Sequence, residues 1–312
     1  LTTQAIEEGW LGALPIWPWI GGRTSILSPA GLFPAAMAGI DVRGLLAGAA
    51  AMDEANRVPD INANPALRLA SIWWAANRPA RPRAMVLLPY RDRLSLLGRY
   101  LQQLVMESLG KGTTRAGDRR PHGLTTYGNK GSTDQHALVQ QLREGPDDAF
   151  VTFVEVLGHG SDGALPGEHG RSGDTLSAFL CGTREALEEA GRPTLTLSLE
   201  SLDAPAVGAV LALFERAVGL YAVLEDINAY DQPGVEAGKG AAEAILKLQE
   251  RLLACLADGT SGAAQDFALL LGESERRVFH VLRHLAATNR ATVSGMGHER
   301  TFGPGDIPPE SP

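Results

Sequence analysis

The stretch RAMVLLPYRDRLSLLGRYLQQLVMESLGK, residues 83–111, joins a run typical of a buried strand to an amphipathic helix. Its first part, Arg83–Tyr90, is almost continuously apolar, which indicates a strand covered on both faces. Over Leu94–Ser108 apolar residues recur at helical spacing, and Gly110 marks the end of that helix. A buried strand followed directly by a helix is the unit of a parallel sheet.

The same alternation continues along the chain. Further strands are predicted at residues 123–129, 149–157 and 193–200, and helices at residues 136–143, 174–190 and 206–224. This order predicts an α/β fold, a three-layer αβα sandwich around a mainly parallel sheet. Residues 110–122 and 158–173 are rich in Gly, Asp, Arg and Ser, so we expect surface loops there.

Capping signals mark the ends of several helices. Ser28 followed by Pro29 has the order of a cap and a first-turn proline. Asp174 and Asp203 are expected at N-caps, because their carboxylates can accept hydrogen bonds from the first free amides. Gly191 is expected to end a helix.

A helix is predicted at residues 235–256, and the chain changes in character after the break at residues 258–262. Two shorter helices are predicted there, at residues 263–271 and 273–288, followed by a β-ribbon at residues 291–302. This outline predicts a small winged-helix-like appendage. Such a module either binds nucleic acid or serves packing, and we expect packing because many non-binding domains share the outline.

Composition narrows the class of protein. The 312 residues carry 28 Lys+Arg against 36 Asp+Glu, a net charge of -8, and 44% are hydrophobic. An acidic balance argues against nucleic acid as the main partner and favours a soluble cytoplasmic enzyme. Cys181 and Cys255 are expected as buried thiols in a reducing compartment, too few for a disulfide or zinc framework. We expect no membrane span, because prolines interrupt the longest uncharged stretches at positions 15, 18, 29 and 34.

Arg23 is the only charged residue between Glu8 and Asp41. An arginine in such apolar surroundings needs an anion or oxygen-rich ligand, or a carboxylate in a domain interface. Gly21 and Gly22 allow the backbone to approach closely just before it. The residues alone leave both interpretations open.

Three further stretches carry candidate chemistry. Glu107 lies in the last turn of a predicted helix, where a carboxylate opposes the helix macrodipole. Such a position suits a general base. Surface glutamates without a function also occupy it, which is the alternative. The loop GNKGSTDQH, ending at His136, follows a strand, where open α/β sheets bind ligands. It does not complete a nucleotide-phosphate loop, because Asn129 intervenes before Lys130.

The third stretch, INAYDQPGVEAGK, contains Gln232, Glu236 and Lys239 around a helix start. A plain surface ion pair between Glu236 and Lys239 is the alternative, since they lie three residues apart. His280 and His284 also share a helix face but lack a third ligand, so no metal site is predicted.

Four of these stretches together resemble the glucose-6-phosphate isomerase family. They are GGRTSILSPAGLFPAAMAGID, MESLGK, YGNKGSTDQHALVQQLREG and NAYDQPGVEAGK, in the family's order. The resemblance extends from about Trp10 to Gln249 and implies sugar-isomerase (SIS) domains. It also implies interconversion of glucose 6-phosphate and fructose 6-phosphate, in glycolysis and gluconeogenesis, with neither metal nor organic cofactor.

The resemblance implies a role for each candidate residue. Glu107 would be the base that moves a proton between C2 and C1 through a cis-enediol, and Arg23 would stabilise the intermediate's charge. His136, supplied across the interface of a homodimer, and Lys239 would open the sugar ring. Gln232 and the backbone near Gly22 would contact the sugar.

One family feature is absent from the sequence: the Ser/Thr-rich loop, of SKSGTT type, that binds the substrate phosphate. We therefore expect residues 1–45 to be the end of a first SIS domain and residues 46–230 the second. Residues 231–258 would form the C-terminal helix and residues 259–312 the appendage. The chain is then expected to be the C-terminal portion of the enzyme and nearly inactive alone. A non-catalytic regulatory protein that binds sugar phosphates is the alternative.

Overall fold

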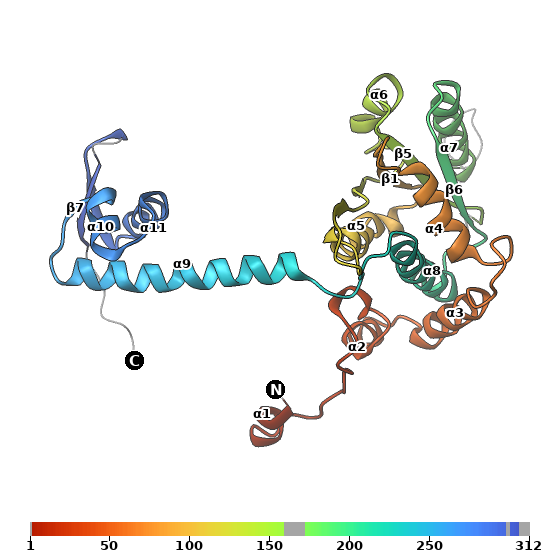
Figure 1. The fold of residues 1–312 in the computed structure, drawn as a ribbon. Helices are drawn as coiled ribbons and strands as arrows, with labels where there is room; N and C mark the ends of the chain where they lie inside the picture. Colours follow the sequence, from red (N-terminus) through yellow and green to blue (C-terminus); the bar gives the residue numbers. More distant parts are fainter. Residues whose placement is uncertain (1, 159–171, 298–299, 306–312) are drawn as a thin grey trace. The chain divides into compact units, whose positions relative to one another are not determined.

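The computed structural model describes residues 2–158, 172–297 and 300–305. It divides into two compact units, Leu1–Asp231 and Gln232–Pro312 (Figure 1). The finer boundaries at residues 45 and 258 stay predictions.

A parallel sheet of four strands forms the centre of the first unit. The strands are β1 (Ala84–Pro89), β4 (Thr126–Gly128), β5 (Ala149–Val156) and β6 (Thr194–Leu199). Their order is β4-β1-β5-β6, and all three pairings are parallel. Residues 85–89 of β1 are all buried, as expected for a central strand covered on both faces. The four predicted strands are confirmed.

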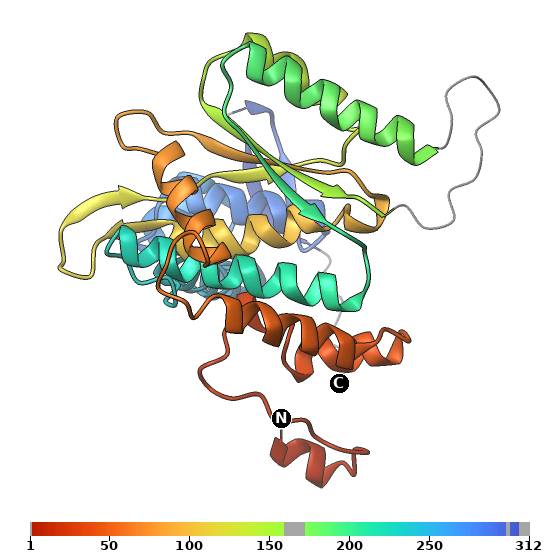
Figure 2. The same cartoon turned by 90° about the vertical axis from the view of Figure 1, so that its right-hand side faces the viewer.

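Helices cover both faces of this sheet, and Figure 2 shows α7 on one side and α8 on the other. One face carries α4 (Pro65–Ala76), α5 (Leu97–Leu109) and α8 (Ala204–Leu224); the other carries α6 (His136–Glu144) and α7 (Ser172–Glu189). Trp73 of α4 is fully buried, with its ring 6.0 Å from that of Phe214 and 6.4 Å from that of Tyr221. The predicted αβα sandwich is confirmed.

The helix α8 is long and apolar enough, by length and composition, to cross a membrane. Its residues Phe214 and Val218 are instead buried in the core over the sheet. The helix α3 (Val42–Ala55) packs against α8 so closely that a Cβ atom at Gly48 or Gly208 would overlap the backbone of the other helix. The apolar composition of α8 is therefore explained by core packing within the first unit.

The N-terminal region contains α1 (Thr2–Glu7), the 3-10 helix η1 (Gly22–Thr24) and α2 (Pro29–Met37). Ser28 caps α2 as predicted, because its Oγ accepts a hydrogen bond from the Ala30 amide at 3.3 Å. The side chains of Trp17 and Trp19 stack with ring centroids 6.0 Å apart, and the two residues are 48% and 78% exposed.

Three local predictions are wrong. Residues 110–122 are not a plain loop but contain an antiparallel ribbon of two strands, β2 (Lys111–Thr113) and β3 (Arg119–His122), which are too short to give a period-2 pattern. Asp174 lies in the first turn of α7 and is no cap, because the helix already begins at Ser172. Cys181 and Cys255 are half-buried free thiols rather than buried ones.

Other local predictions are confirmed. The helix α5 ends at Leu109 with Gly110 as its C-cap, as predicted, but it begins at Leu97, because the 3-10 helix η2 (Asp92–Leu94) occupies the first residues of the predicted helix. Asp203 caps α8 by accepting a hydrogen bond from the Ala206 amide at 2.9 Å, and Gly191 follows α7 with a φ of 72°. Most of the loop predicted at residues 158–173 lies outside the described residues.

The second unit has its own core. It contains α9 (Pro233–Ala257), β7 (Gly262–Ala263), α10 (Ala264–Leu271), α11 (Glu275–Ala287), β8 (Ala291–Ser294) and β9 (Thr301–Pro304). The strands form an antiparallel sheet of order β7-β9-β8. Leu252, Phe267, Leu282 and Phe302 are buried together. The two shorter helices and the ribbon are found where the sequence predicts them. Helix, strand, two helices and a two-stranded ribbon is the order of a winged helix, in which α9, predicted as a separate helix before the appendage, is the first helix.

Candidate active site

Arg23 is buried in the first unit, with 6% of its surface exposed. Its Nη1 donates to Ser108 Oγ at 2.7 Å and to the Ala229 carbonyl, and its Nη2 donates to the Tyr230 carbonyl at 3.0 Å. Its Nε lies 3.4 Å from Glu107 Oε1 as an ion pair without hydrogen-bond geometry. The carboxylate that a buried arginine requires is thus Glu107.

Glu107 occupies the last turn of α5, where the helix pattern of the sequence predicts it. Its side chain is 22% exposed, so one side meets Arg23 while another remains accessible. Gln103, one turn earlier, donates to Glu107 Oε2 at 3.2 Å. The two oxygens of the carboxylate are therefore oriented by a cation and an amide. The sequence analysis missed Gln103, although its i, i+4 spacing to Glu107 was the available signal.

Lys111 is a second buried cation that the sequence analysis missed. Its side chain is 5% exposed, and its Nζ donates to the Glu107 carbonyl at 3.1 Å and to the Asp231 carbonyl at 3.0 Å. Asp231 Oδ1 lies 3.4 Å from the same nitrogen. Burial lowers the pKa of Lys111, and the charge of Asp231 opposes that shift. Its place in MESLGK, directly after the helix stop, associates Lys111 with Glu107 but does not indicate that Lys111 is buried.

Arg23 and Lys111 together hold one short segment of backbone. Three consecutive carbonyls, at positions 229–231, accept hydrogen bonds from these two cations. Neither strand nor helix pairing satisfies these carbonyls, so the buried cations supply the donors. The cluster thereby joins the end of α5 to the segment that precedes Gln232.

The other predicted residues form none of the hydrogen bonds or ion pairs of this cluster that the structure describes. Gly22 is adjacent to Arg23 in η1, and a Cβ atom at its position would meet no described atom. Gln232 and Lys239 belong to the second unit, where Gln232 is the N-cap residue of α9 and Lys239 is exposed in its second turn.

His136 is not near Glu107 within the first unit. Gly128, at the end of β4, lies beside Gly98 at the start of α5, whereas Gly123, before β4, lies beside Gly110 at the end of α5. Glu107 is therefore at the opposite end of the β4–α5 pair from the loop that leads to His136, and Figure 1 shows α6 well away from α5. His136 is exposed as the first residue of α6.

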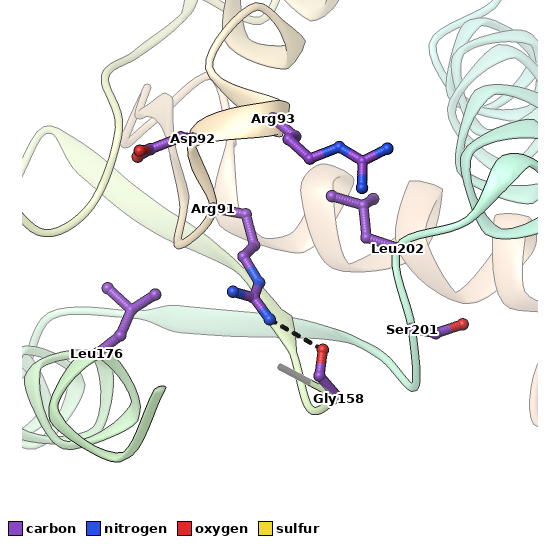
Figure 3. A pocket seen from close by; sticks show the side chains of 7 residues that line it. All are labelled: Arg91, Asp92, Arg93, Gly158, Leu176, Ser201 and Leu202. Atoms are coloured by element: carbon purple, nitrogen blue, oxygen red, sulfur yellow. Dashed lines mark hydrogen bonds between the residues drawn. The ribbon is translucent and has the colours of Figure 1, made fainter. Parts of the chain in front are cut away.

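The carboxyl ends of the strands form a separate pocket (Figure 3). It has a volume of 540 Å³ and is lined by Arg91, Asp92, Arg93, Gly158, Leu176, Ser201 and Leu202. Arg91 donates to the Gly158 carbonyl at 2.9 Å, while Asp92 pairs with Lys130 at 2.7 Å. Open α/β sheets usually bind ligands at this edge. The Arg23–Glu107 cluster, by contrast, lies at the other end of α5.

Among the described residues, no group of three or more His, Cys, Asp and Glu side chains has the arrangement of a metal site. The chemistry that the Arg23 cluster offers is proton transfer. It combines a partly accessible carboxylate with two cations that the fold holds in place.

The fold and this cluster define an α/β protein with a parallel sheet and a group of charged side chains suited to proton transfer, and comparison with known proteins identifies the family. The family model for phosphoglucose isomerase matches residues 11–188 and 184–254. The chain belongs to the phosphoglucose isomerase family.

Individual relatives agree. A glucose-6-phosphate isomerase of Synechococcus sp. (strain CC9605) is 53% identical over 292 residues, 93% of this chain and 54% of the relative. One from Geobacter sp. (strain M21) is 53% identical, over 94% of this chain and 56% of the relative. The chain thus spans about half the length of these relatives.

Two solved structures share the fold. A hypothetical protein from Thermus thermophilus matches with a TM-score of 0.72 and 35% identity, over 78% of this chain and 59% of that protein. A glucose-6-phosphate isomerase from Chlamydia trachomatis matches with a TM-score of 0.67 and 28% identity, over 75% of this chain and 48% of the other.

Proposed function

We propose that this chain carries the proton-transfer residues of an enzyme that interconverts glucose 6-phosphate and fructose 6-phosphate. The observation that supports this most is the Arg23–Glu107 ion pair, which joins two stretches 84 positions apart that both belong to the family pattern. The names of the relatives favour this isomerase over a non-catalytic regulatory protein.

Glu107 is the base in this proposal. Its carboxylate takes the proton from C2 of the open-chain aldose, the C2–H electrons form the C1=C2 bond, and the C1 carbonyl oxygen takes up a proton. The resulting cis-enediol collapses in the other direction: the C2 hydroxyl loses its proton to become the ketone, and Glu107 returns its proton to C1. No electrons enter or leave, so no external oxidant is needed.

Arg23 supplies positive charge beside this transfer. Both Nη1 hydrogens and one Nη2 hydrogen go to protein oxygens, which fixes the guanidinium and leaves the second Nη2 hydrogen for developing negative charge on the enediol. A cation held by the fold needs no reorganisation during the reaction. Rigidity at this position therefore favours catalysis.

The remaining roles are part of the same proposal. His136, from a second copy in a homodimer, and Lys239 move protons at the ring oxygen and the anomeric hydroxyl, while Gln232 and the Gly22 backbone contact the sugar. The geometry within the first unit is compatible with an external source of His136, since Glu107 and His136 occupy opposite ends of the β4–α5 pair. The enzyme acts in the cytoplasm and uses no cofactor.

The test is to incubate glucose 6-phosphate with this chain in D₂O and to measure, by proton NMR, the exchange of the hydrogen at C2 for deuterium. Exchange accumulates over hours, so it detects slow proton transfer even where overall turnover is low. We expect Glu107→Gln to reduce the exchange rate about 10²–10⁴-fold, the usual contribution of a general base.

The matched control is Glu54→Gln, which removes an equal charge from a side chain that is 83% exposed. It is expected to leave the exchange rate unchanged. Equal exchange by the Glu107→Gln variant and the unaltered chain would remove Glu107 as the base.

A further inference from the structure

The part of the second unit that follows α9 has no role in the proposed isomerase chemistry, because Gln232 and Lys239 both lie at the start of α9. Its element order, α9-β7-α10-α11-β8-β9, places α11 in the position of the helix that enters the major groove in DNA-binding winged helices. Topology alone assigns no partner, because many folds with this order bind none. The charge on the outer face of α11 is the deciding observation.

The helix α11 has two sharply different faces. Val278, Val281, Leu282 and Leu285 are buried against the core of the second unit. The exposed residues of the helix include Arg276, Arg277, His280, Arg283 and His284. Arg276, His280 and Arg283 recur at intervals of four and three, so they form one continuous stripe.

The arginines on this face are available to bind a ligand. Within the described ranges, Arg276, Arg277 and Arg283 form no hydrogen bond or ion pair, although carboxylates occur nearby. Arg251 of α9, in contrast, pairs with Glu273 at 2.7 Å and donates to the Leu271 carbonyl at 2.6 Å. Glu273 is therefore occupied, and Glu275, at the first turn of α11, is the only acidic residue in the helix.

The positive charge on the exposed face of α11 contrasts with the negative net charge of the whole chain. A net charge of -8 would repel a polyanion if it were spread evenly. Exposed cations concentrated on one helix, without carboxylate partners, instead form the kind of local surface that neutralises phosphates. The width of the DNA major groove, about 12 Å, admits one α-helix, whereas the major groove of A-form RNA is too narrow for side chains to read.

We propose that the outer face of α11 binds double-stranded DNA through backbone phosphates, with the helix in the major groove. The partner is duplex DNA rather than an acidic protein, because the helix lies between a turn and a two-stranded ribbon that can contact flanking backbone. Arg300, next to β9, adds a further cation to that ribbon. The sequence-based expectation of a packing module came from the outline of helices and strands, and the acidic balance argued separately against nucleic acid as the main partner. Neither observation shows this face.

The experiment is fluorescence anisotropy of a labelled DNA duplex of about 20 base pairs, two turns of the double helix, titrated with the full 312-residue chain at several NaCl concentrations. We expect binding that weakens as salt rises, because bound cations displace counterions from DNA. An RNA duplex of equal length is expected to bind more weakly. Absence of any salt-sensitive binding, or equal affinity for both duplexes, overturns the proposal.

The variant that assigns binding to α11 is the double substitution Arg276→Gln and Arg283→Gln. We expect the slope of log affinity against log salt to fall by about 1 for each arginine removed, and affinity at about 0.1 M salt to fall on the order of tens of fold. The matched control is Arg43→Gln with Arg99→Gln, two exposed arginines of the first unit. The control has the same change in net charge and is expected to bind as the unaltered chain does.

Circular dichroism and the melting temperature distinguish lost binding from lost folding in the α11 variant. Neither arginine contacts another described side chain through a hydrogen bond or ion pair, so both measurements are expected to be unchanged. Equal loss of affinity in the control variant would mean that total charge, rather than the α11 face, attracts the DNA, and would contradict the assignment.

Discussion

Arg23 and the arginines of α11 carry the same guanidinium group in opposite surroundings. Arg23 is 6% exposed, with Glu107, Ser108 and two backbone carbonyls around it. Arg276 and Arg283 are exposed and, within the part of the chain that the structure describes, have no such partner. A buried arginine maintains internal geometry, whereas an exposed one without partners is available to a ligand. Removing each kind should therefore affect different properties.

The largest expected effect comes from Arg23→Met. The substitution leaves Glu107 next to an apolar side chain and removes the donors of the Ala229 and Tyr230 carbonyls, so we expect the free energy of unfolding to fall by about 3–5 kcal/mol. Urea unfolding followed by circular dichroism measures it. Because the chain has two units, the transition of the first unit is the one to compare.

Arg43→Met is the matched control for that measurement. Arg43 is exposed in α3 and makes no hydrogen bond or ion pair with the described residues. Its replacement is expected to change the free energy of unfolding by less than about 0.5 kcal/mol. If both substitutions destabilise equally, the cluster around Arg23 is not what holds the first unit together.

The contrast between the two kinds of arginine also shows which parts of the fold and of the site could be predicted from the sequence. The strand at β1 and the helix α5 follow from apolar periodicity, and that periodicity places Glu107 in the last turn. The isolated position of Arg23 predicts a buried oxygen partner. The identity of that partner could not be predicted from the residues alone, because Arg23 and Glu107 are far apart in the chain and meet only through packing of η1 against α5.

Lys111 and the face of α11 were missed for different reasons. Lys111 follows a helix stop in a stretch that was expected to be a surface loop, so its burial could not be predicted. On α11, the alternation of arginine and histidine is visible in the sequence, but whether carboxylates neutralise them depends on tertiary contacts. Arg251 shows this, because its partner Glu273 is 22 residues away.

Glu215 extends the comparison to a half-buried acid without a cationic partner among the described residues. It accepts one hydrogen bond, from the Tyr100 hydroxyl at 3.2 Å, and burial raises the pKa of Glu215 to about 7. The folded state therefore keeps a proton that the unfolded chain releases near pH ~4.3. This contribution to stability is complete below about pH 4 and is lost as the pH rises through about 7.

Glu215→Gln removes this dependence while keeping an acceptor for Tyr100. The free energy of unfolding of the variant relative to the original chain should rise by about 2 kcal/mol between about pH 4 and pH 8. Urea unfolding at several pH values across this range measures the change. A constant difference would show that Glu215 titrates normally in the folded state.

For Lys111→Met we expect a smaller fall in the free energy of unfolding, of about 1 kcal/mol. The variant loses the hydrogen bonds to the carbonyls of Glu107 and Asp231, but this loss is partly offset because a desolvated charge is removed. Burial lowers the pKa of Lys111 in the folded state, so the unfolded chain binds its proton more strongly. Stability of the original chain should therefore rise with pH through the interval that ends near pH ~10.4, the ordinary lysine value. The variant should lack this rise, and an identical pH profile for both chains would contradict the assignment.

The smallest effect on stability is expected where the effect on binding is largest. Replacing Arg276 and Arg283 by Gln removes two charges that contact no described acceptor, so the free energy of unfolding of the second unit should change by less than about 0.5 kcal/mol. Relief of repulsion among the cations of α11 acts in the stabilising direction. A loss above about 1 kcal/mol, measured by urea unfolding, would exceed what surface substitutions cost. These arginines would then support the fold as Arg23 does, and the contrast between the two kinds of arginine would fail.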